Sequence, residues 1–521
     1  MHILENYVAG QWRAGQGQPA RLHDPVTGAV LAGASSAGLD LPAAFAWARQ
    51  QGGAALRAMS YAQRAALLAR VAEVLTAHRD KYFEIALANS GTVQADSAID
   101  IDGALYTVGY YAKQGSRLAE DAWRMDGPAD ALARDNAYAV QHVRTPARGL
   151  ALLINAFNFP SWGLWEKAAP ALLSGVPIVV KPATSTAWLA HEMVRDVIQA
   201  GILPPGALSL VCGGSAGLLD ALRPLDLLSF TGSADTAAQL RAHPALLRGE
   251  VSLNAETDSV NSAVLGPDAA EGGPAFDALV REVVREMRAK SGQKCTAIRR
   301  ILVPAERYDA VAGAISAQLA RITVGNPRHD SVKMGALVSR AQFDNVQSGL
   351  AALRGAAEVL YDGAGLPLVD ADPAVAACMA PTLLGARQPQ ALLHQTEVFG
   401  PVATLMPYRD TAQAWAMARL GEGSLVASLY SDDSDFLAQG AQALAESHGR
   451  VHLVSPEAAK SHTGHGNVMP QSLHGGPGRA GGGQELGGLR ALDFYHRRSA
   501  VQGAPARLES LPTARAAAFA E

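Results

Sequence analysis

The sequence predicts an α/β protein whose parallel sheets are wrapped by helices on both faces, a doubly wound architecture. Three observations carry this prediction. Short apolar strands alternate with helices between residues 149 and 262, the alternation restarts near Gly266, and 49% of the 521 residues are hydrophobic. That apolar content is enough to bury a large core.

The N-terminal part is expected to begin with a hairpin and continue as helices. Residues 7–12 indicate two short strands around a turn at Gly10. Between residues 41 and 88, apolar side chains recur at helical spacing and predict a helix hairpin. A further helix is expected over 104–124.

Region 149–262 contains the first expected parallel sheet. The predicted strands and helices follow one another as strand 152–154, helix 162–173, strand 178–180, helix 186–200, strand 208–211 and strand 227–230. Parallel strands joined in this way open their carboxyl ends at one edge of the sheet, where ligands bind.

A second α/β domain is expected over 263–460, with helices at 275–290 and 306–321 and a strand at 299–303. Residues 461–487 form a glycine-rich loop. The tail after Pro505 is rich in alanine and is expected to fray or to dock on the surface.

Charge and cysteine content exclude several classes of protein. The 44 basic and 48 acidic residues leave a net charge of −4, without the basic excess of a nucleic-acid binder. The N-terminus is no signal peptide, and the most apolar stretch, 149–159, is too short to span a bilayer. Three cysteines suit a reducing compartment. We therefore expect a soluble cytoplasmic enzyme with no membrane or nucleic-acid partner.

Two motifs match known patterns with different outcomes. Residues 476–481 spell a dinucleotide fingerprint, but no strand precedes them, so an irregular loop is the better interpretation. Residues 213–217 match the nucleophile elbow of serine hydrolases, with a strand before and a helix after. A hydrolase centred on Ser215, with Asp226 and His243 as partners, stays open as an alternative of another class.

No metal site is expected. His191 and Glu192 open a zinc pattern, but Arg195 stands where its second histidine belongs. Three further histidines, His462, His465 and His474, lie in the glycine-rich loop and are expected to be solvated there.

Cys295 is the cysteine whose surroundings favour reactivity. It follows a predicted helix within the polar segment Ser291–Thr296, whereas Cys378 lies between Ala377 and Met379, like a core thiol. Local composition leaves a structural role equally open.

Six motifs in order resemble the aldehyde dehydrogenase superfamily over nearly the whole chain. They are Asn158-Phe159-Pro160, Lys181-Pro182-Ala183, Phe230-Thr231-Gly232-Ser233, Leu253-Asn254-Ala255-Glu256, Gly292-Gln293-Lys294-Cys295 and Glu397-Val398-Phe399-Gly400-Pro401. The resemblance implies an aldehyde dehydrogenase fold of two doubly wound domains and a small β oligomerisation element.

The resemblance also implies the catalytic residues. Cys295 would add to the aldehyde, the Asn158 amide and the Cys295 backbone N–H would hold the oxyanion, and Glu256 would activate water to hydrolyse the thioester. We expect burial to raise the pKa of Glu256. Lys167 and Glu485 match a proton-relaying pair. The alternatives are a solvated loop carboxylate at Glu256, a helix cap at Asn158, and two surface charges at Lys167 and Glu485.

The implied cofactor is NADP, with NAD as the alternative. Thr184 stands where NAD-preferring relatives often carry a glutamate that would repel a 2′-phosphate. Phe157 replaces the family's tryptophan, and Ala237 replaces a glycine of its phosphate segment. The residues that match the family's cofactor contacts are Ile154, Phe157, Lys181, Thr184, Ser185, Gly214, Thr231, Gly232, Ser233, Glu397 and Phe399.

Trp165-Glu166-Lys167 and residues 474–489 resemble the members that oxidise CoA-linked semialdehydes of aromatic-acid breakdown. Because the sequence ends at Glu521, a stand-alone enzyme is expected rather than one fused to a hydratase, as in phenylacetate breakdown. The phenylacetate-route semialdehyde is the alternative substrate. A catalytically silent scaffold, which would bind the cofactor without forming NADPH, is disfavoured by the intact set of Cys295, Glu256 and Asn158.

The resemblance divides the chain as well. Residues 1–125 and 146–262 would bind the dinucleotide, and 263–460 would carry the nucleophile. Residues 126–145 and 488–521, including 136–143 and 489–501, would form a homodimer.

Overall fold

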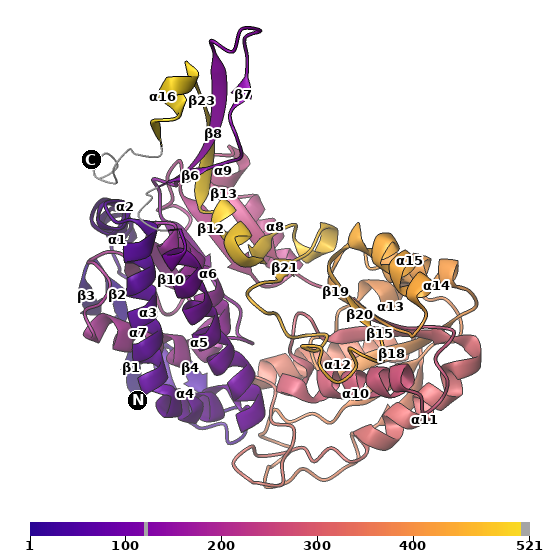
Figure 1. Ribbon diagram of the computed structural model, residues 1–521. Helices are drawn as coiled ribbons and strands as arrows, with labels where there is room; N and C mark the ends of the chain where they lie inside the picture. The colour runs from indigo at the N-terminus through magenta and orange to yellow at the C-terminus, as the bar shows by residue number, and fades with distance from the viewer. Residues whose placement is uncertain (119–122, 512–521) are drawn as a thin grey trace.

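Two seven-stranded sheets, each covered by helices on both faces, form the body of the protein in a computed structural model (Figure 1). The structure describes residues 1–118 and 123–511. Parts of the expected dinucleotide-binding and oligomerisation segments, 119–122 and 512–521, lie outside the described residues. The α/β fold class predicted from the sequence is confirmed.

The first sheet is mainly parallel and buried on both faces. Its order is β13 (Ser252–Glu256), β12 (Leu227–Thr231), β9 (Ala151–Ile154), β10 (Ile178–Lys181), β11 (Leu208–Leu210), β2 (Asn6–Val8) and β3 (Gln11–Arg13). The first five strands are parallel, and β2 adds antiparallel to β11. The N-terminal hairpin is therefore confirmed. The central strands are runs of Leu, Ile and Val because helices cover both faces.

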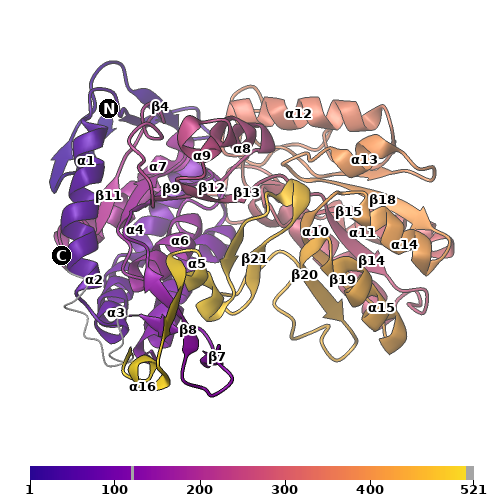
Figure 2. The same ribbon diagram turned by 90° about the horizontal axis from the view of Figure 1, so that it is seen from above.

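Helices on one face of this sheet share a single apolar cluster. They are α2 (Gly53–Arg57), α3 (Tyr61–Ala77), α4 (Arg79–Ile85), α5 (Gln94–Ser116), α6 (Trp162–Leu173) and α7 (Ala187–Gln199). A second cluster on the other face contains α1 (Leu41–Trp47), α8 (Ala234–Arg241) and α9 (Pro244–Leu247) (Figure 2). Helix α6 has the bounds that its periodicity predicted.

The helix hairpin expected over 41–88 is wrong in detail. A short π-helix at Ala48–Gly52 joins α1 to α2. Helix α3 begins separately, at a capping box formed by Ser60 and Gln63. At Gly52, an added Cβ would lie 2.1 Å from the Gly206 carbonyl, so this segment bends where two backbones meet. Helix α5 begins and ends earlier than the expected 104–124.

A small sheet, β1 (His2–Leu4), β5 (Val30–Ala34) and β4 (Ala20–His23), was not predicted. Its short strands carry no clear alternation, so only pairing across the chain defines them.

The second sheet holds the thiol-bearing loop. Its order is β16 (Glu358–Asp362), β17 (Thr382–Gly385), β18 (Val402–Tyr408), β15 (Ile298–Pro304), β14 (Asn261–Leu265), β19 (Ser424–Tyr430) and β20 (His448–Val454). Its helices are α10 (Pro274–Arg288), α11 (Tyr308–Leu319), α12 (Arg340–Arg354), α13 (Ala391–Gln395), α14 (Thr411–Arg419) and α15 (Ser434–Ala445). Strand β14 starts slightly before the boundary expected at residue 263.

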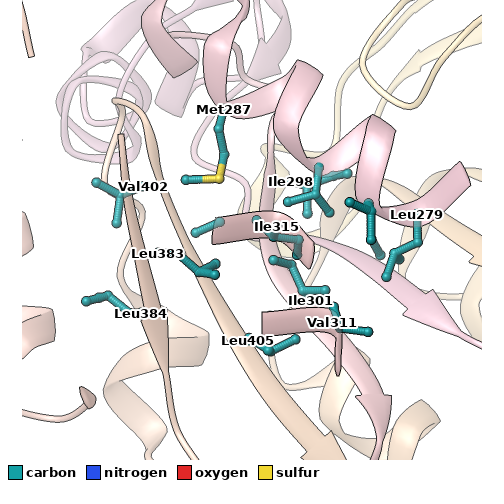
Figure 3. Packing of buried hydrophobic residues seen from close by; sticks show 14 of the residues in the cluster. Leu279, Met287, Ile298, Ile301, Val311, Ile315, Leu383, Leu384, Val402 and Leu405 are labelled. Atoms are coloured by element: carbon teal, nitrogen blue, oxygen red, sulfur yellow. The ribbon is translucent and has the colours of Figure 1, made fainter. Parts of the chain in front are cut away.

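Figure 3 shows how α10 and α11 pack on this second sheet. Met287 of α10 and Val311 and Ile315 of α11 point toward the sheet. There they meet the side chains of β15 and β18, among them Ile301 and Leu405, and all five side chains are buried. This packing fixes the C-terminal end of α10, from which the cysteine loop departs.

A separate antiparallel sheet projects from the body (Figure 1). It consists of β6 (Arg124–Met125), β7 (Asp130–Ala131), β8 (Ala139–Pro146) and β23 (His496–Gly503), with α16 (Pro505–Leu508) beside it. Strands β8 and β23 pair from His496–Pro146 to Gly503–Ala139. Strands β21 (Leu473–Gly475) and β22 (Gln484–Leu486) form a two-stranded ribbon between the two large sheets (Figure 2).

Among residues 1–118 and 123–511, no helix has the length and apolar character that crossing a membrane requires.

Candidate active site

A cleft opens at the carboxyl ends of β9, β10, β12 and β13, where parallel sheets bind ligands. Its volume is about 570 Å³. The first sheet contributes the residues from Ile154 to Asn158, Lys181, Thr184, the residues from Phe230 to Ser233, and Glu256. The second sheet and its loops contribute Cys295, Gln342, Glu397 and Phe399.

A strained loop after α10 presents Cys295. Lys290, Ser291 and Gly292 have φ of 51°, 54° and 70°, a left-handed run that costs free energy at the two non-glycine residues. Surrounding contacts hold it: the Ser291 hydroxyl donates to the Gly335 carbonyl at 3.0 Å, and Arg299 donates to the Gly292 carbonyl at 2.8 Å.

Gly292 leaves no room for a side chain, and this gives a stability prediction. An added Cβ would lie 2.3 Å from the Gly400 carbonyl oxygen, in a left-handed conformation. We expect Gly292→Ala to lower the free energy of unfolding by at least ~1–3 kcal/mol, the cost of such strain, measured by urea denaturation. The control is Gly313→Ala in α11, where nothing lies within 4 Å of the added Cβ. That variant is expected to be neutral or up to ~1 kcal/mol more stable. Equal stability of the two variants would contradict the packing argument.

Cys295 lies where two cavities meet. It lines the cleft and also a smaller cavity of about 200 Å³, called the tunnel below. The tunnel wall is mostly apolar and consists of Ile99, Gly103, Phe159, Trp162, Thr296, the segment from Gly466 to Met469, and His474. A ligand in the cleft and a slender molecule in the tunnel would therefore both reach the sulfur atom.

The resting thiol is neutral. Burial raises the pKa of Cys295 well above its ordinary value, and the Glu256 carboxylate adds to that rise. A base must therefore take the proton as the sulfur attacks a carbonyl carbon.

Glu256 ends β13 beside the thiol and is only 4% exposed. Sulfur of Cys295, a Glu256 carboxylate oxygen and a His474 ring nitrogen all lie within 4.8 Å of one another. A solvated loop carboxylate is excluded. The expected rise in the pKa of Glu256 is wrong: burial raises it, but His474 and Lys167 outweigh burial and hold it below its ordinary value. The carboxylate is therefore ionised and ready to accept a proton.

Asn158 follows β9 and is 8% exposed. Its amide Nδ2 donates to the Gln293 carbonyl at 3.0 Å, which ties it to the cysteine loop. Helix α6 starts after Ser161, and the N–H groups of Ser161 and Trp162 bind the Asp100 carboxylate. A helix-capping role for Asn158 is therefore wrong, and its amide lies beside the thiol, where an oxyanion would form.

Lys167 and Glu485 are both buried, and the charge of Glu485 helps to raise the pKa of Lys167, but no direct hydrogen bond or ion pair joins the two among the described residues. The Lys167 ammonium binds the Glu166 carboxylate, its neighbour on α6. Glu485 accepts from the Ser229 hydroxyl at 2.6 Å and from the Asn254 amide at 2.7 Å. The alternative of two surface charges is excluded, and the role of the pair as a proton relay stays a prediction.

The cleft fits a dinucleotide. Within the part of the chain that the structure describes, Glu397 Oε1, Thr231 Oγ1 and both polar atoms of the Asn155 side chain are buried without a hydrogen-bond partner. A ligand with hydroxyl and amide groups would satisfy them. Burial raises the pKa of Glu397 to about 8, and its side chain faces the same cleft as Phe399.

Most of the residues expected to contact the cofactor line this cleft. Phe157 packs edge-on against Phe399 with ring centroids 5.7 Å apart, so the phenylalanine in place of tryptophan has an aromatic partner. Ser233 caps α8, and Ala237 is buried behind it. Two expected contacts lie outside the lining: Ser185, and Gly214, which borders a neighbouring hollow and accepts from the Ser36 hydroxyl.

The serine hydrolase alternative is not supported, because Asp226 is not placed to act as the acid beside His243. The Asp226 carboxylate is fully buried and binds Arg49 at 2.9 Å and the Leu150 N–H at 3.0 Å. His243 instead contacts Asp220 at 3.2 Å on an open surface. No hydrogen bond joins Ser215 to His243 in residues 1–118 and 123–511.

The expectation that no strand precedes residues 476–481 is wrong, because β21 ends at Gly475 and Gly478–Ala480 form a 3-10 turn. The segment still lacks the context of a dinucleotide fingerprint, since β21 belongs to an antiparallel ribbon and the segment does not line the cleft. Gly481 packs on β13, where an added Cβ would lie 2.3 Å from the Ala255 carbonyl. The loop therefore needs glycine because it presses on the strand that carries Glu256.

The expectation of solvated loop histidines is wrong for two of the three. His465 is 0% and His474 is 1% exposed, and His465 binds the Ser428 hydroxyl at 2.6 Å. His474 and Trp162 belong to the site, and no spacing in the sequence pointed to the histidine.

A half-buried thiol, a carboxylate and an amide beside a dinucleotide cleft define a nicotinamide-dependent oxidoreductase that works through a covalent cysteine intermediate. The sequence profile of the Aldehyde dehydrogenase family matches residues 12–501. The chain belongs to the aldehyde dehydrogenase family. It is an oxidoreductase that uses NAD or NADP and acts on a small-molecule aldehyde.

Relatives support this assignment. The chain is 54% identical over 477 residues to 3,4-dehydroadipyl-CoA semialdehyde dehydrogenase of Aromatoleum evansii, covering 91% of this chain and 93% of that protein. Succinate-semialdehyde dehydrogenase from Burkholderia pseudomallei superposes with a TM-score of 0.83 at 26% identity, covering 97% and 98% of the two chains. HpcC from Thermus thermophilus shares the fold, with a TM-score of 0.85 at 24% identity, covering 96% and 93%.

Proposed function

We propose that this enzyme oxidises a CoA-linked semialdehyde, 3,4-dehydroadipyl-CoA semialdehyde, to the free acid with NADP. The observation that carries the proposal is the position of Cys295 at the junction of the dinucleotide cleft and the apolar tunnel. The identity of 54% to the Aromatoleum evansii enzyme supports the substrate. A narrow tunnel suits an unbranched acyl chain that continues into pantetheine.

We assign the steps of the reaction to these residues as follows. Cys295 adds to the aldehyde carbon while Glu256 accepts its proton, and the Asn158 amide and the Cys295 N–H stabilise the oxyanion. The nicotinamide, when bound, accepts a hydride, which leaves a thioester on Cys295. Glu256 then activates water, so the product is the acid.

The test is an assay of purified protein with NADP or NAD against CoA-linked and free semialdehydes. We expect the largest kcat/KM for 3,4-dehydroadipyl-CoA semialdehyde with NADP. A larger value for the phenylacetate-route semialdehyde, or for aldehydes without CoA, would overturn the substrate and leave the reaction class in place.

We propose NADP because Thr184 lines the cleft near Lys181 and no carboxylate stands at its position. We expect Thr184→Glu to lower kcat/KM for NADP by about 10-fold or more, since a carboxylate repels the 2′-phosphate by at least ~1 kcal/mol even in water-like surroundings. The value for NAD should stay level or rise. Thr236→Glu in α8, which also lines the cleft, is a charge-matched control whose NADP:NAD ratio should change less. An unchanged ratio in Thr184→Glu would contradict the proposal.

The domain roles are proposed with it: residues 1–125 and 146–262 bind the dinucleotide, and 263–460 carry the nucleophile. The projecting strands β8 and β23 would join two chains into a homodimer. The open backbone edge of β23, whose residues 498–500 are exposed, supports this assembly.

A further inference from the structure

We propose that His474 is a catalytic residue of this enzyme, which takes from Glu256 the proton that the Cys295 thiol loses and so frees Glu256 to activate water. The inference rests on the proposed function, because it concerns how the base is restored between the two halves of the reaction.

His474 touches the reacting groups. Its Nε2 lies 3.0 Å from Oε2 of Glu256, and its ring lines the tunnel together with Cys295. The side chain is 1% exposed. Neither ring nitrogen makes a well-aligned hydrogen bond within the part of the chain that the structure describes. A buried imidazole with two unsatisfied nitrogens beside a carboxylate is placed to exchange a proton.

The β21–β22 ribbon holds this histidine in register with Glu256. His474 pairs directly with Glu485 across the ribbon. Glu485 is hydrogen-bonded to Asn254, which lies on β13 two residues before Glu256, and the Gln484 N–H donates to the Asn254 side chain at 2.8 Å. The ribbon is therefore docked on the strand that ends in the general base.

Trp162 of α6 also helps to hold the His474 ring in place. Its indole and the His474 imidazole meet edge to face, with centroids 5.3 Å apart. The imidazole therefore packs from the ribbon against α6, and both rings line the tunnel.

The proton balance requires such an acceptor. As the sulfur–carbon bond forms, the S–H proton passes to Glu256, and a protonated Glu256 cannot act as a base toward water. In this scheme the resting imidazole is neutral and carries its hydrogen on Nδ1, so Nε2 is free to accept. Transfer from Oε2 to Nε2 of His474 restores the carboxylate, and the positive charge that His474 then carries holds the pKa of Glu256 below its ordinary value. Water then gives its proton to Glu256 as it attacks the thioester, and that proton returns to the departing thiolate. The proton on His474 leaves through the tunnel as the one net proton of the oxidation.

The other charged groups around His474 and Glu256 are poorly placed for this transfer. Lys167 is buried, yet the charges of Glu166, Glu485 and Glu256 raise its pKa above the ordinary value, so it is already protonated. Glu166 is bound to Lys167, and no hydrogen bond or ion pair joins it to Glu256 among the described residues. Glu485 already accepts two hydrogen bonds.

The first experiment separates proton transfer from positioning. A glutamine side chain in His474→Gln can donate to Glu256 but cannot take its proton, whereas His474→Phe can do neither. With saturating substrate, we expect both variants to form about one NADPH per active site in a burst, followed by steady turnover that is about 10²-fold slower or more. Wild-type turnover in His474→Gln would overturn the proposal.

The second experiment uses His474→Ala with added imidazole. Imidazole and substituted imidazoles should restore steady turnover in a saturable way, and more basic compounds should restore more. An absence of rescue, or rescue that does not depend on basicity, would overturn the proposal, since a structural role gives no such dependence.

His452→Gln is the matched control, because that ring packs on His465, with centroids 6.5 Å apart, and lies outside the tunnel lining. It should keep the wild-type burst and turnover. Thermal unfolding and NADP titration verify that each variant folds. If wild-type protein forms no NADPH from any semialdehyde, the proposed function fails. If wild-type protein forms NADPH and the His474 variants turn over as fast as wild type, this inference fails and the proposed function stands.

Discussion

Replacing Cys295 by alanine is expected to abolish NADPH formation while cofactor binding stays intact. The sulfur is the atom that bonds to the aldehyde carbon, and the remaining two cysteines, Cys212 and Cys378, are buried elsewhere. Loss of a nucleophile lowers turnover by at least about 10⁴-fold. NADPH absorbance measures the first result, and the quench of tryptophan fluorescence by NADP measures the second.

Cys212→Ser is the control for the loss of a thiol. Cys212 is fully buried under β2 and accounts for none of the tunnel or cleft lining, so that variant should keep its activity. Turnover in Cys295→Ala near the wild-type rate would refute the nucleophile assignment.

Glu256→Gln is expected to carry out one hydride transfer and then stall as an acyl-enzyme. Glutamine cannot accept a proton from water, so the thioester on Cys295 persists. The thiol proton can still pass to His474, a ring nitrogen of which lies within 4.8 Å of the Cys295 sulfur, and this allows the first step. Steady turnover should fall by about 10²–10⁴-fold, the usual contribution of a general base.

Rapid-mixing absorbance should therefore show a burst of about one NADPH per site, and intact-mass measurement should show the added acyl group. Glu250→Gln, at an exposed carboxylate just before β13, is the control and should show no burst followed by a stall. Multiple turnovers of Glu256→Gln at the normal rate would place water activation at another residue.

Local sequence patterns predicted the elements that form continuous apolar runs. Helix α6 and strand β10 lie where their apolar patterns placed them, because a helix buried on all sides and a strand covered on both faces leave a continuous apolar signal. The region 41–88 was less predictable. Its alanine-rich pattern is the same in one long helix and in several short ones, and the breaks come from contacts with distant backbone such as Gly206.

The site was predictable where a residue acts by its chemical type at a fixed place in a motif. Cys295, Glu256 and Asn158 lie together, as their motifs implied. The partner of Lys167 was not predictable, because the choice between Glu166 and Glu485 depends on the side-chain direction on α6 and on the docking of β22. The prediction that the pKa of Glu256 is raised was wrong for the same reason. Burial of Glu256 could be foreseen, but the charges of His474 and Lys167 beside it could not.

By itself, the order of residues determined the two α/β halves and the cleft at the strand ends, since apolar patterning is a local property. Cys295 was singled out by the resemblance of six motifs to a known family, because local composition had left its role open. Only the tertiary structure decided that His474, far along the chain and in a segment expected to be solvated, reaches the base and the thiol. The physical reason is that a short ribbon docks on β13 through buried hydrogen bonds, and such long-range pairing leaves no periodic trace in the sequence.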